Sequence, residues 1–91
     1  MTIVRRIPKE ELDDAHLKLC MRVASMLLDL MEKTGVSYAT IDARLGRRPG
    51  WSRSLINDLI NGNTDELRIV SDLSYAMGYT PHITFENPHD S

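Results

Sequence analysis

Apolar side chains recur at helical spacing along most of the chain. From about residue 8 they return every three or four positions as far as the stop signal at residues 33–35. Pro8 suits a first helical turn, and the acidic residues that follow it complement the positive end of the helix dipole. The pattern predicts one long helix that begins between about residues 8 and 13 and ends before Gly35.

Three shorter helices are expected after Gly35. Ser37 can cap the first of these, which turns Ile41 and Leu45 inward, and Thr64 or Asp65 can cap the last. The helix between them begins at Trp51, and its apolar positions are Leu55, Ile56, Leu59 and Ile60. Its polar positions are Ser52, Arg53, Ser54, Asn57, Asp58 and Asn61. We therefore expect an all-α domain of four or five helices over residues 8–79.

Both ends of the chain differ from this helical body. Residues 1–7 alternate apolar and polar side chains, which fits an N-terminal arm or a short strand. Residues 80–86 predict a strand that carries Ile83 and Phe85, and residues 87–91 predict a flexible polar tail. A lone strand exposes unpaired backbone groups. We expect it to pair with its symmetry mate, or with residues 3–7, and so to form a dimer.

Charge is unevenly distributed along the chain. The formal net charge of −2 is not typical of a nucleic-acid-binding protein. Arg44, Arg47, Arg48 and Arg53 nevertheless fall within ten residues that contain no acid. This cluster forms either a solvated loop or a basic face on an otherwise acidic molecule.

Several function classes find no support in the sequence. The single cysteine cannot form an internal disulfide and offers no metal-ligand spacing. Neither a membrane-spanning run nor a secretory segment is visible, so we expect a cytoplasmic protein of bacterial or phage origin. No nucleophile stands near a credible base, and no glycine-rich phosphate loop follows a strand. We expect neither an enzyme nor a bound cofactor or metal.

The second and third predicted helices meet the requirements of a major-groove reader. They are short, amphipathic and joined by a turn that contains glycine. Arginine suits guanine and asparagine suits adenine, so we expect base contacts from Arg53, Ser54 and Asn57. The phosphate backbone would be contacted by Arg44, Arg47, Arg48 and Ser52.

The stretch 36–79 resembles the lambda-repressor-like helix-turn-helix family, also called the Cro or XRE family. The resemblance covers about half of the chain and rests on four matches in order: Leu45-Gly46, Ser52-Arg53-Ser54, Leu59-Ile60-Asn61-Gly62 and Ala76-Met77-Gly78-Tyr79. It implies operator binding by a dimer that acts as a transcriptional repressor, a phage regulator or an antitoxin. It also implies phosphate contacts from Tyr38 and Asn63.

The chain departs from the family pattern at two places. Asp42 stands where the family usually has a small alanine, and a buried carboxylate there is costly unless it is paired, for example with Arg44, Arg47 or Arg48. If Asp42 has no such partner, either the match of this stretch to the family pattern is off by one residue or the second and third helices are splayed apart. Residues 47–50 lengthen the usual tight turn, either by extending the second helix or, as we favour, as a basic loop that follows the phosphate backbone.

These observations predict sequence-specific binding to double-stranded DNA. A homodimer would place two recognition helices about one DNA turn apart, roughly 34 Å, on an inverted-repeat operator. The acidic overall charge favours one alternative, in which the module is an antitoxin or adaptor whose main ligand is a protein such as a toxin or another regulator. A salt series separates the two, because binding through several phosphates weakens steeply as salt rises.

Overall fold

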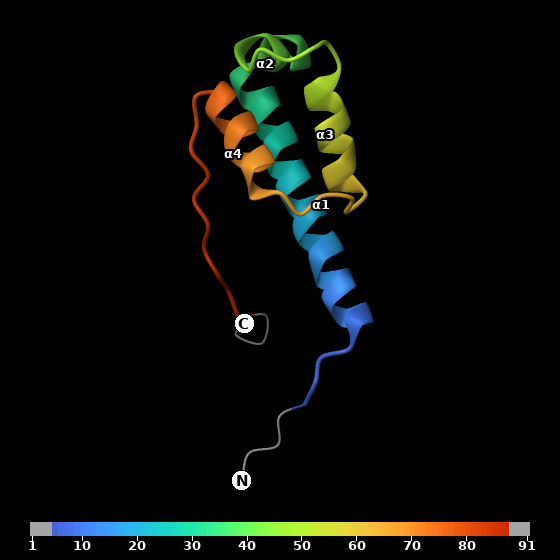
Figure 1. The fold of residues 1–91 in the computed structure, drawn as a ribbon. Coiled ribbons are helices and arrows are strands. Elements are labelled where there is room, and N and C mark those ends of the chain that lie inside the picture. Colours follow the sequence, from blue (N-terminus) through green and yellow to red (C-terminus); the bar gives the residue numbers. More distant parts are fainter. Residues whose placement is uncertain (1–4, 88–91) are drawn as a thin grey trace.

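Four helices make up the regular structure of the part of the chain that is described. The computed structural model describes residues 5–87, and residues 1–4 and 88–91 lie outside it. The helices are α1 (Lys9–Thr34), α2 (Tyr38–Arg44), α3 (Trp51–Ile60) and α4 (Leu67–Ala76). Figure 1 shows α2, α3 and α4 grouped around the C-terminal part of α1. The predicted all-α class is confirmed, and residues 5–87 contain no strand.

The long helix α1 begins and ends where the sequence predicts. The carbonyl of Pro8 accepts hydrogen bonds from the N–H groups of Glu11 and Leu12 at 3.1 and 3.3 Å. At the other end Gly35 has a φ of 70°, and its N–H donates to the carbonyl of Met31 at 2.9 Å. Glycine adopts this left-handed conformation without steric cost, so Gly35 ends the helix and satisfies one of its last carbonyls.

The caps of α2 and α4 were predicted with different success. Ser37 caps α2 as expected, because its hydroxyl accepts a hydrogen bond from the N–H of Thr40 at 3.2 Å. The predicted cap of α4 is displaced, since the N-cap residue is Glu66 rather than Thr64 or Asp65. The Thr64 hydroxyl instead accepts from the N–H of Glu66 at 3.3 Å, which orders the turn just before the helix.

The hydrophobic core lies where the four helices meet. Ile41, Ile56 and Leu73 are completely buried, and the other buried apolar residues are Cys20, Ala24, Leu27, Leu59, Ile69, Ala76 and Met77. Burial of this apolar surface supplies the main favourable term in folding. Ile60, an apolar position of the predicted third helix, does not belong to this core, because it is 39% exposed. It is the last residue of α3 and is rotated about 100° from the buried Leu59 beside it.

The N-terminal part of α1 projects beyond the other helices. α1 has 26 residues, and residues 9–19 include no buried side chain. At 1.5 Å per residue the helix is about 39 Å long. Figure 1 shows its first turns, in blue, extending past the ends of α3 and α4. This part of α1 is therefore a helix without a packing partner in the single chain.

The C-terminal segment, residues 80–86, runs back alongside the helices as extended chain (Figure 1). The Lys33 ammonium lies 5.6 Å from the ring centroid of Tyr79, and Arg22 pairs with Glu86 at 3.6 Å, so the segment is held near α1 at both ends. The predicted strand is not formed in the single chain, because a strand needs a second edge to receive its hydrogen bonds. Ile83 and Phe85 are 67% and 97% exposed.

The predicted N-terminal arm and C-terminal tail fall mostly on residues whose structure is not described. Residues 5–7 are exposed and belong to no helix or strand. Residues 1–4 lie outside the described part, so pairing of residues 3–7 with the C-terminal segment stays a prediction. Of the predicted tail at residues 87–91, Asn87 alone is described, and it is exposed.

Candidate nucleic-acid interface

Asp42 joins α2 to the start of α3. Its side chain is buried, and its carboxylate accepts hydrogen bonds from the N–H groups of Ser52 at 2.8 Å and Gly50 at 3.0 Å. Both donors stand at the N-terminal end of α3, where a helix supplies no acceptor of its own. Asp42 therefore caps a helix other than the one on which it lies.

The electrostatics of Asp42 follow from these two donors. Burial by itself raises the pKa of a carboxyl group, but hydrogen bonding from Ser52 and Gly50 outweighs it and holds the pKa of Asp42 below its ordinary value. The arginine partners expected from the sequence are wrong, because main-chain N–H groups satisfy the carboxylate instead. The negative charge also complements the positive end of the α3 dipole.

The turn between α2 and α3 is a loop, as the sequence favours. α2 ends at Arg44, and the N–H of Arg47 donates back to the carbonyl of Asp42 at 2.8 Å. Gly50 has a φ of 91°, a conformation that side chains rarely adopt, and it stands directly before α3. Residues 47–50 are all exposed, so Arg47 and Arg48 project into solvent beside the first turn of α3.

Ser52 does not lie on the polar face of α3, which corrects its predicted role as a phosphate contact. It is 0% exposed, and its hydroxyl donates to the carbonyl of Tyr38 at 3.2 Å. Ser52 lies four residues before Ile56 and seven before Leu59, so all three share the core face. That spacing was visible in the sequence, but the hydroxyl suggested an exposed position. Ser52 and Asp42 together bind the start of α3 to α2.

Two aromatic rings support two of the arginines. The guanidinium carbon of Arg53 lies 5.3 Å from the ring centroid of Tyr38, and that of Arg47 lies 4.8 Å from the ring centroid of Trp51. Such cation–π contacts are worth about 0.5–1 kcal/mol at exposed sites. They restrict side chains that are otherwise flexible. Tyr38 and Trp51 are half-buried, so each ring also packs against the core.

The outer face of α3 carries the three side chains predicted to contact bases. Arg53, Ser54 and Asn57 are all exposed, whereas Ile56 and Leu59 hold the opposite face against the core. Arg53 and Asn57 are one helical turn apart and therefore lie on the same side. Their donors and acceptors are the types that read guanine and adenine in a major groove. Asp58, half-buried, is the one acid within α3.

Arg44 and Arg48, both predicted to contact phosphates, lie in different surroundings. One guanidinium nitrogen of Arg44 donates to the carbonyl of Ala76 at 2.7 Å, at the C-terminal end of α4. This contact satisfies a helix-end carbonyl and places a cation at the negative end of a dipole. Arg44 can reach a phosphate only with its remaining nitrogens. The carbonyl of Arg48 accepts a hydrogen bond from the N–H of Trp51 at 3.2 Å, whereas its exposed guanidinium group makes no hydrogen bond or ion pair with any described residue.

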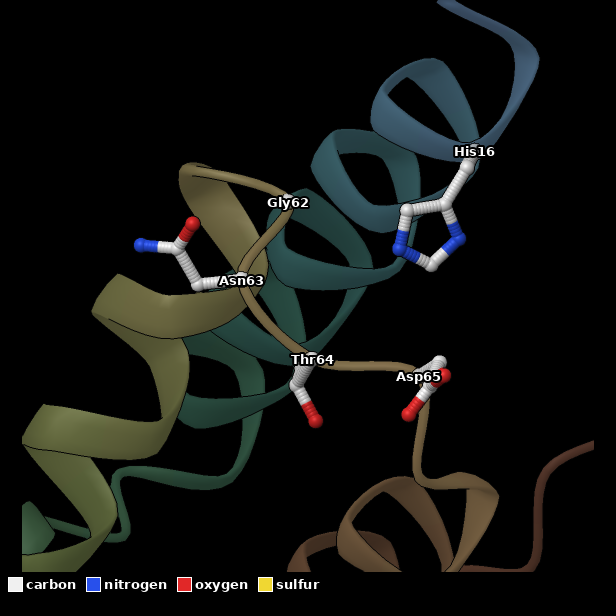
Figure 2. A pocket seen from close by; sticks show the side chains of 5 residues that line it. All are labelled: His16, Gly62, Asn63, Thr64 and Asp65. Carbon is white, nitrogen blue, oxygen red and sulfur yellow. The ribbon is translucent and has the colours of Figure 1, made fainter. Parts of the chain in front are cut away.

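Asn63, predicted to contact phosphate, lies at the far end of α3 from the arginine loop. It lines an open polar pocket of about 260 Å³ together with His16, Gly62, Thr64 and Asp65. Figure 2 shows its side chain pointing away from His16, on the outer side of the turn. Tyr38 stands at the opposite end of α3, under Arg53. The two predicted contacts therefore flank the helix.

The segment that forms this surface carries only positive charge. Residues 43–57 contain four arginines and no acid.

Within the described part of the chain, no cluster of side chains is suited to a metal ion, and no helix is long and apolar enough to cross a membrane. Comparison of the chain with protein-family models, curated proteins and solved structures finds no match.

Proposed function

We propose that the chain binds double-stranded DNA with α3 in the major groove. The observation that supports this most is the division of α3 into two faces, with Arg53, Ser54 and Asn57 exposed and Ile56 and Leu59 buried. A groove about 12 Å wide admits one helix, provided that its back is held by a core. The arginines of the preceding loop lie where they would meet the phosphates that flank the groove.

The proposed biological role is that of a transcriptional repressor of the lambda-repressor-like helix-turn-helix type, bound as a dimer at an inverted-repeat operator. In this proposal α2 and α3 form the helix-turn-helix pair, joined by the residue 45–50 loop that Asp42 closes. Base contacts come from Arg53, Ser54 and Asn57. Phosphate contacts come from Tyr38, Arg44, Arg47, Arg48 and Asn63. Ser52 is not part of the interface, because it is buried.

The C-terminal segment supports dimer formation. The backbone groups of residues 80–86 make no hydrogen bond to any other described residue, and the segment is extended and exposed along its length. Such a segment can pair as a β-strand with the same segment of a second copy. Ile83 and Phe85, on alternate positions of one face, would then be covered.

The test begins with selection of bound fragments from random or genomic DNA by the purified protein. On the selected site, Arg53→Ala should weaken binding by about 1–3 kcal/mol and relax the preference at one base position. Arg48→Gln should weaken all sequences equally and lower the salt slope by about 1, because a phosphate contact releases one counterion. Binding is measured by fluorescence anisotropy over a salt series.

Arg68→Gln is the matched control for these variants. Arg68 lies on α4 and is also exposed, and its pairing with Asp72 at 3.6 Å is a surface ion pair. Its removal should leave DNA affinity unchanged. Failure of the wild-type protein to enrich any DNA would reject the proposal and favour the protein-binding alternative. A salt-independent affinity for DNA would do the same.

A further inference from the structure

An apolar face that the described residues cover only in part runs along α1. Leu12, Leu19 and Met26 are 54%, 58% and 60% exposed, and they recur every seven residues. His16 and the half-buried Val23 and Leu30 alternate with them. The row 12, 16, 19, 23, 26, 30 has the alternating three- and four-residue spacing of helices that pair along their length.

The exposed members of this row, Leu12, Leu19 and Met26, lie on the side of α1 away from Gly62, whereas the half-buried His16 and Val23 border grooves that the end of α3 and the start of α4 also line. The side chain of Leu17 lies against Gly62, just after α3, and Leu19 is rotated about 200° from Leu17 around the helix. Leu67, at the start of α4, is 74% exposed and borders the same face across an apolar groove that Leu19 and Val23 also line. Figure 1 shows α4 and the C-terminal segment on one side of α1 and α3 on the other.

The exposed apolar area of this face is comparable to the area that one partner contributes to a protein–protein interface. Leu12, Leu19, Met26 and Leu67, with Ile83 and Phe85 of the adjacent segment, expose roughly 600 Å² of apolar side chain. The largest apolar patch on a typical monomer is about 300–600 Å². Each partner in a stable complex contributes about 800 Å² in all. With a polar rim added, this face has the size that one half of a dimer needs.

We propose that a second copy of this chain covers this face, with the two α1 helices antiparallel and Leu19 near the two-fold axis. Leu12 of one copy then packs against Met26 of the other, because both are seven residues from Leu19. The projecting turns of each α1 lie against the body of the second copy. A parallel pair would instead bring together two acidic first turns, each with Glu10, Glu11, Asp13 and Asp14.

This arrangement has two geometric consequences. A two-fold axis perpendicular to the helices keeps like edges on the same side of the dimer, so both C-terminal segments lie on one side of it. Each segment runs beside the part of α1 between Lys33 and Arg22, beyond Leu19, so the two segments approach each other only at their Glu86 ends. The order across the dimer is α3, α1, α1, α3, and three steps of about 8–10 Å separate the outer helices by about 24–30 Å. That spacing approaches the roughly 34 Å between half-sites. This second consequence alone rests on the proposed function.

Sedimentation equilibrium without DNA tests the dimer independently of the proposed function. The wild-type chain should sediment as a dimer at micromolar concentration. Leu19→Glu, which brings two like charges together at the axis, should raise the dissociation constant by about 100-fold or more. Met21→Glu is the control, because Met21 is 50% exposed on another face of α1 and its change should leave the dimer intact. Circular dichroism checks that both variants keep their helices.

Cysteine cross-linking tests the orientation, even if Leu19→Glu were to unfold. The double variant Leu12→Cys with Met26→Cys should form disulfide-linked dimers under mild oxidation, and Leu12→Cys alone should not. A monomeric wild-type chain, equal effects of Leu19→Glu and Met21→Glu, or efficient cross-linking of Leu12→Cys alone would each overturn the proposal. A dimer that enriches no DNA would leave this inference standing and reject the proposed function.

Discussion

Asp42→Ala removes the one side chain that ties the start of α3 to α2 by hydrogen bonds to its backbone. The N–H groups of Ser52 and Gly50 then lose their acceptor. Gly50 is exposed, so water can replace the carboxylate there. Ser52 is 0% exposed, and no water can reach its N–H without a local opening. The loss is therefore concentrated at one buried donor.

The size of the effect follows from that burial. A buried donor without an acceptor costs about 1–3 kcal/mol, so the free energy of unfolding should fall by that amount through the N–H of Ser52. For a domain of this size each kcal/mol lowers Tm by about 4–8 °C. Asp42→Asn should be intermediate, because its amide oxygen can still accept the bond from Ser52 while its NH₂ group cannot accept the one from Gly50.

Urea denaturation measures the free energy, and hydrogen exchange at the amide of Ser52 locates the change. Asp29→Ala is the control, because Asp29 is exposed on α1 and its substitution removes the same charge without touching α3. If Asp42→Ala matched the stability of Asp29→Ala, and the amide of Ser52 kept its protection, the capping argument would be refuted. Packing alone would then hold α3 in place.

Two further outcomes are expected from the same structure. Gly62→Ala should destabilise the fold by about 1–2 kcal/mol in urea denaturation, because residue 62 has a φ of 68° and an added Cβ would lie 2.9 Å from the Leu17 side chain. Gly46 also has a positive φ but has open space around it, so Gly46→Ala should cost less. Equal losses of stability in the two variants would contradict the steric part of the argument. Acid should also destabilise the protein through Asp42: its pKa is lowered in the folded state, so its contribution is fully present above its ordinary value of 3.8 and is lost as pH falls through the lower folded value. A pH series of urea melts on the wild type and on Asp42→Asn checks this, and parallel curves below pH 4 would contradict it.

The helices could be predicted from local signals. Pro8, Gly35 and Ser37 mark helix ends through φ preferences and side-chain caps that depend on neighbouring residues only. The spacing of Ile41, Ile56 and Leu59 likewise identifies the side of each helix that becomes buried. The polar outer face of α3, with Arg53 and Asn57, follows from the same periodicity.

The partners of polar side chains could not be predicted in this way. A sequence that contains Asp42 near three arginines favours an ion pair, yet the acceptor is used by two backbone N–H groups that only the packing of α2 on α3 brings within reach. Ser52 has the hydroxyl of a surface residue, but it lies between two helices. Arg44 reaches Ala76 across 32 positions of chain, a distance over which local patterns carry no information.

The amino-acid sequence by itself determined where α1 begins and ends, where α2 and α3 begin and which faces of the helices are apolar, because those properties depend on dihedral preferences and on periodicity within a few residues. The tertiary structure alone decided which buried polar atoms meet, and it showed that the first turns of α1 keep Leu12 and Leu19 exposed. Both outcomes depend on how four helices approach one another, and that approach is set by the joint packing of side chains far apart in the chain.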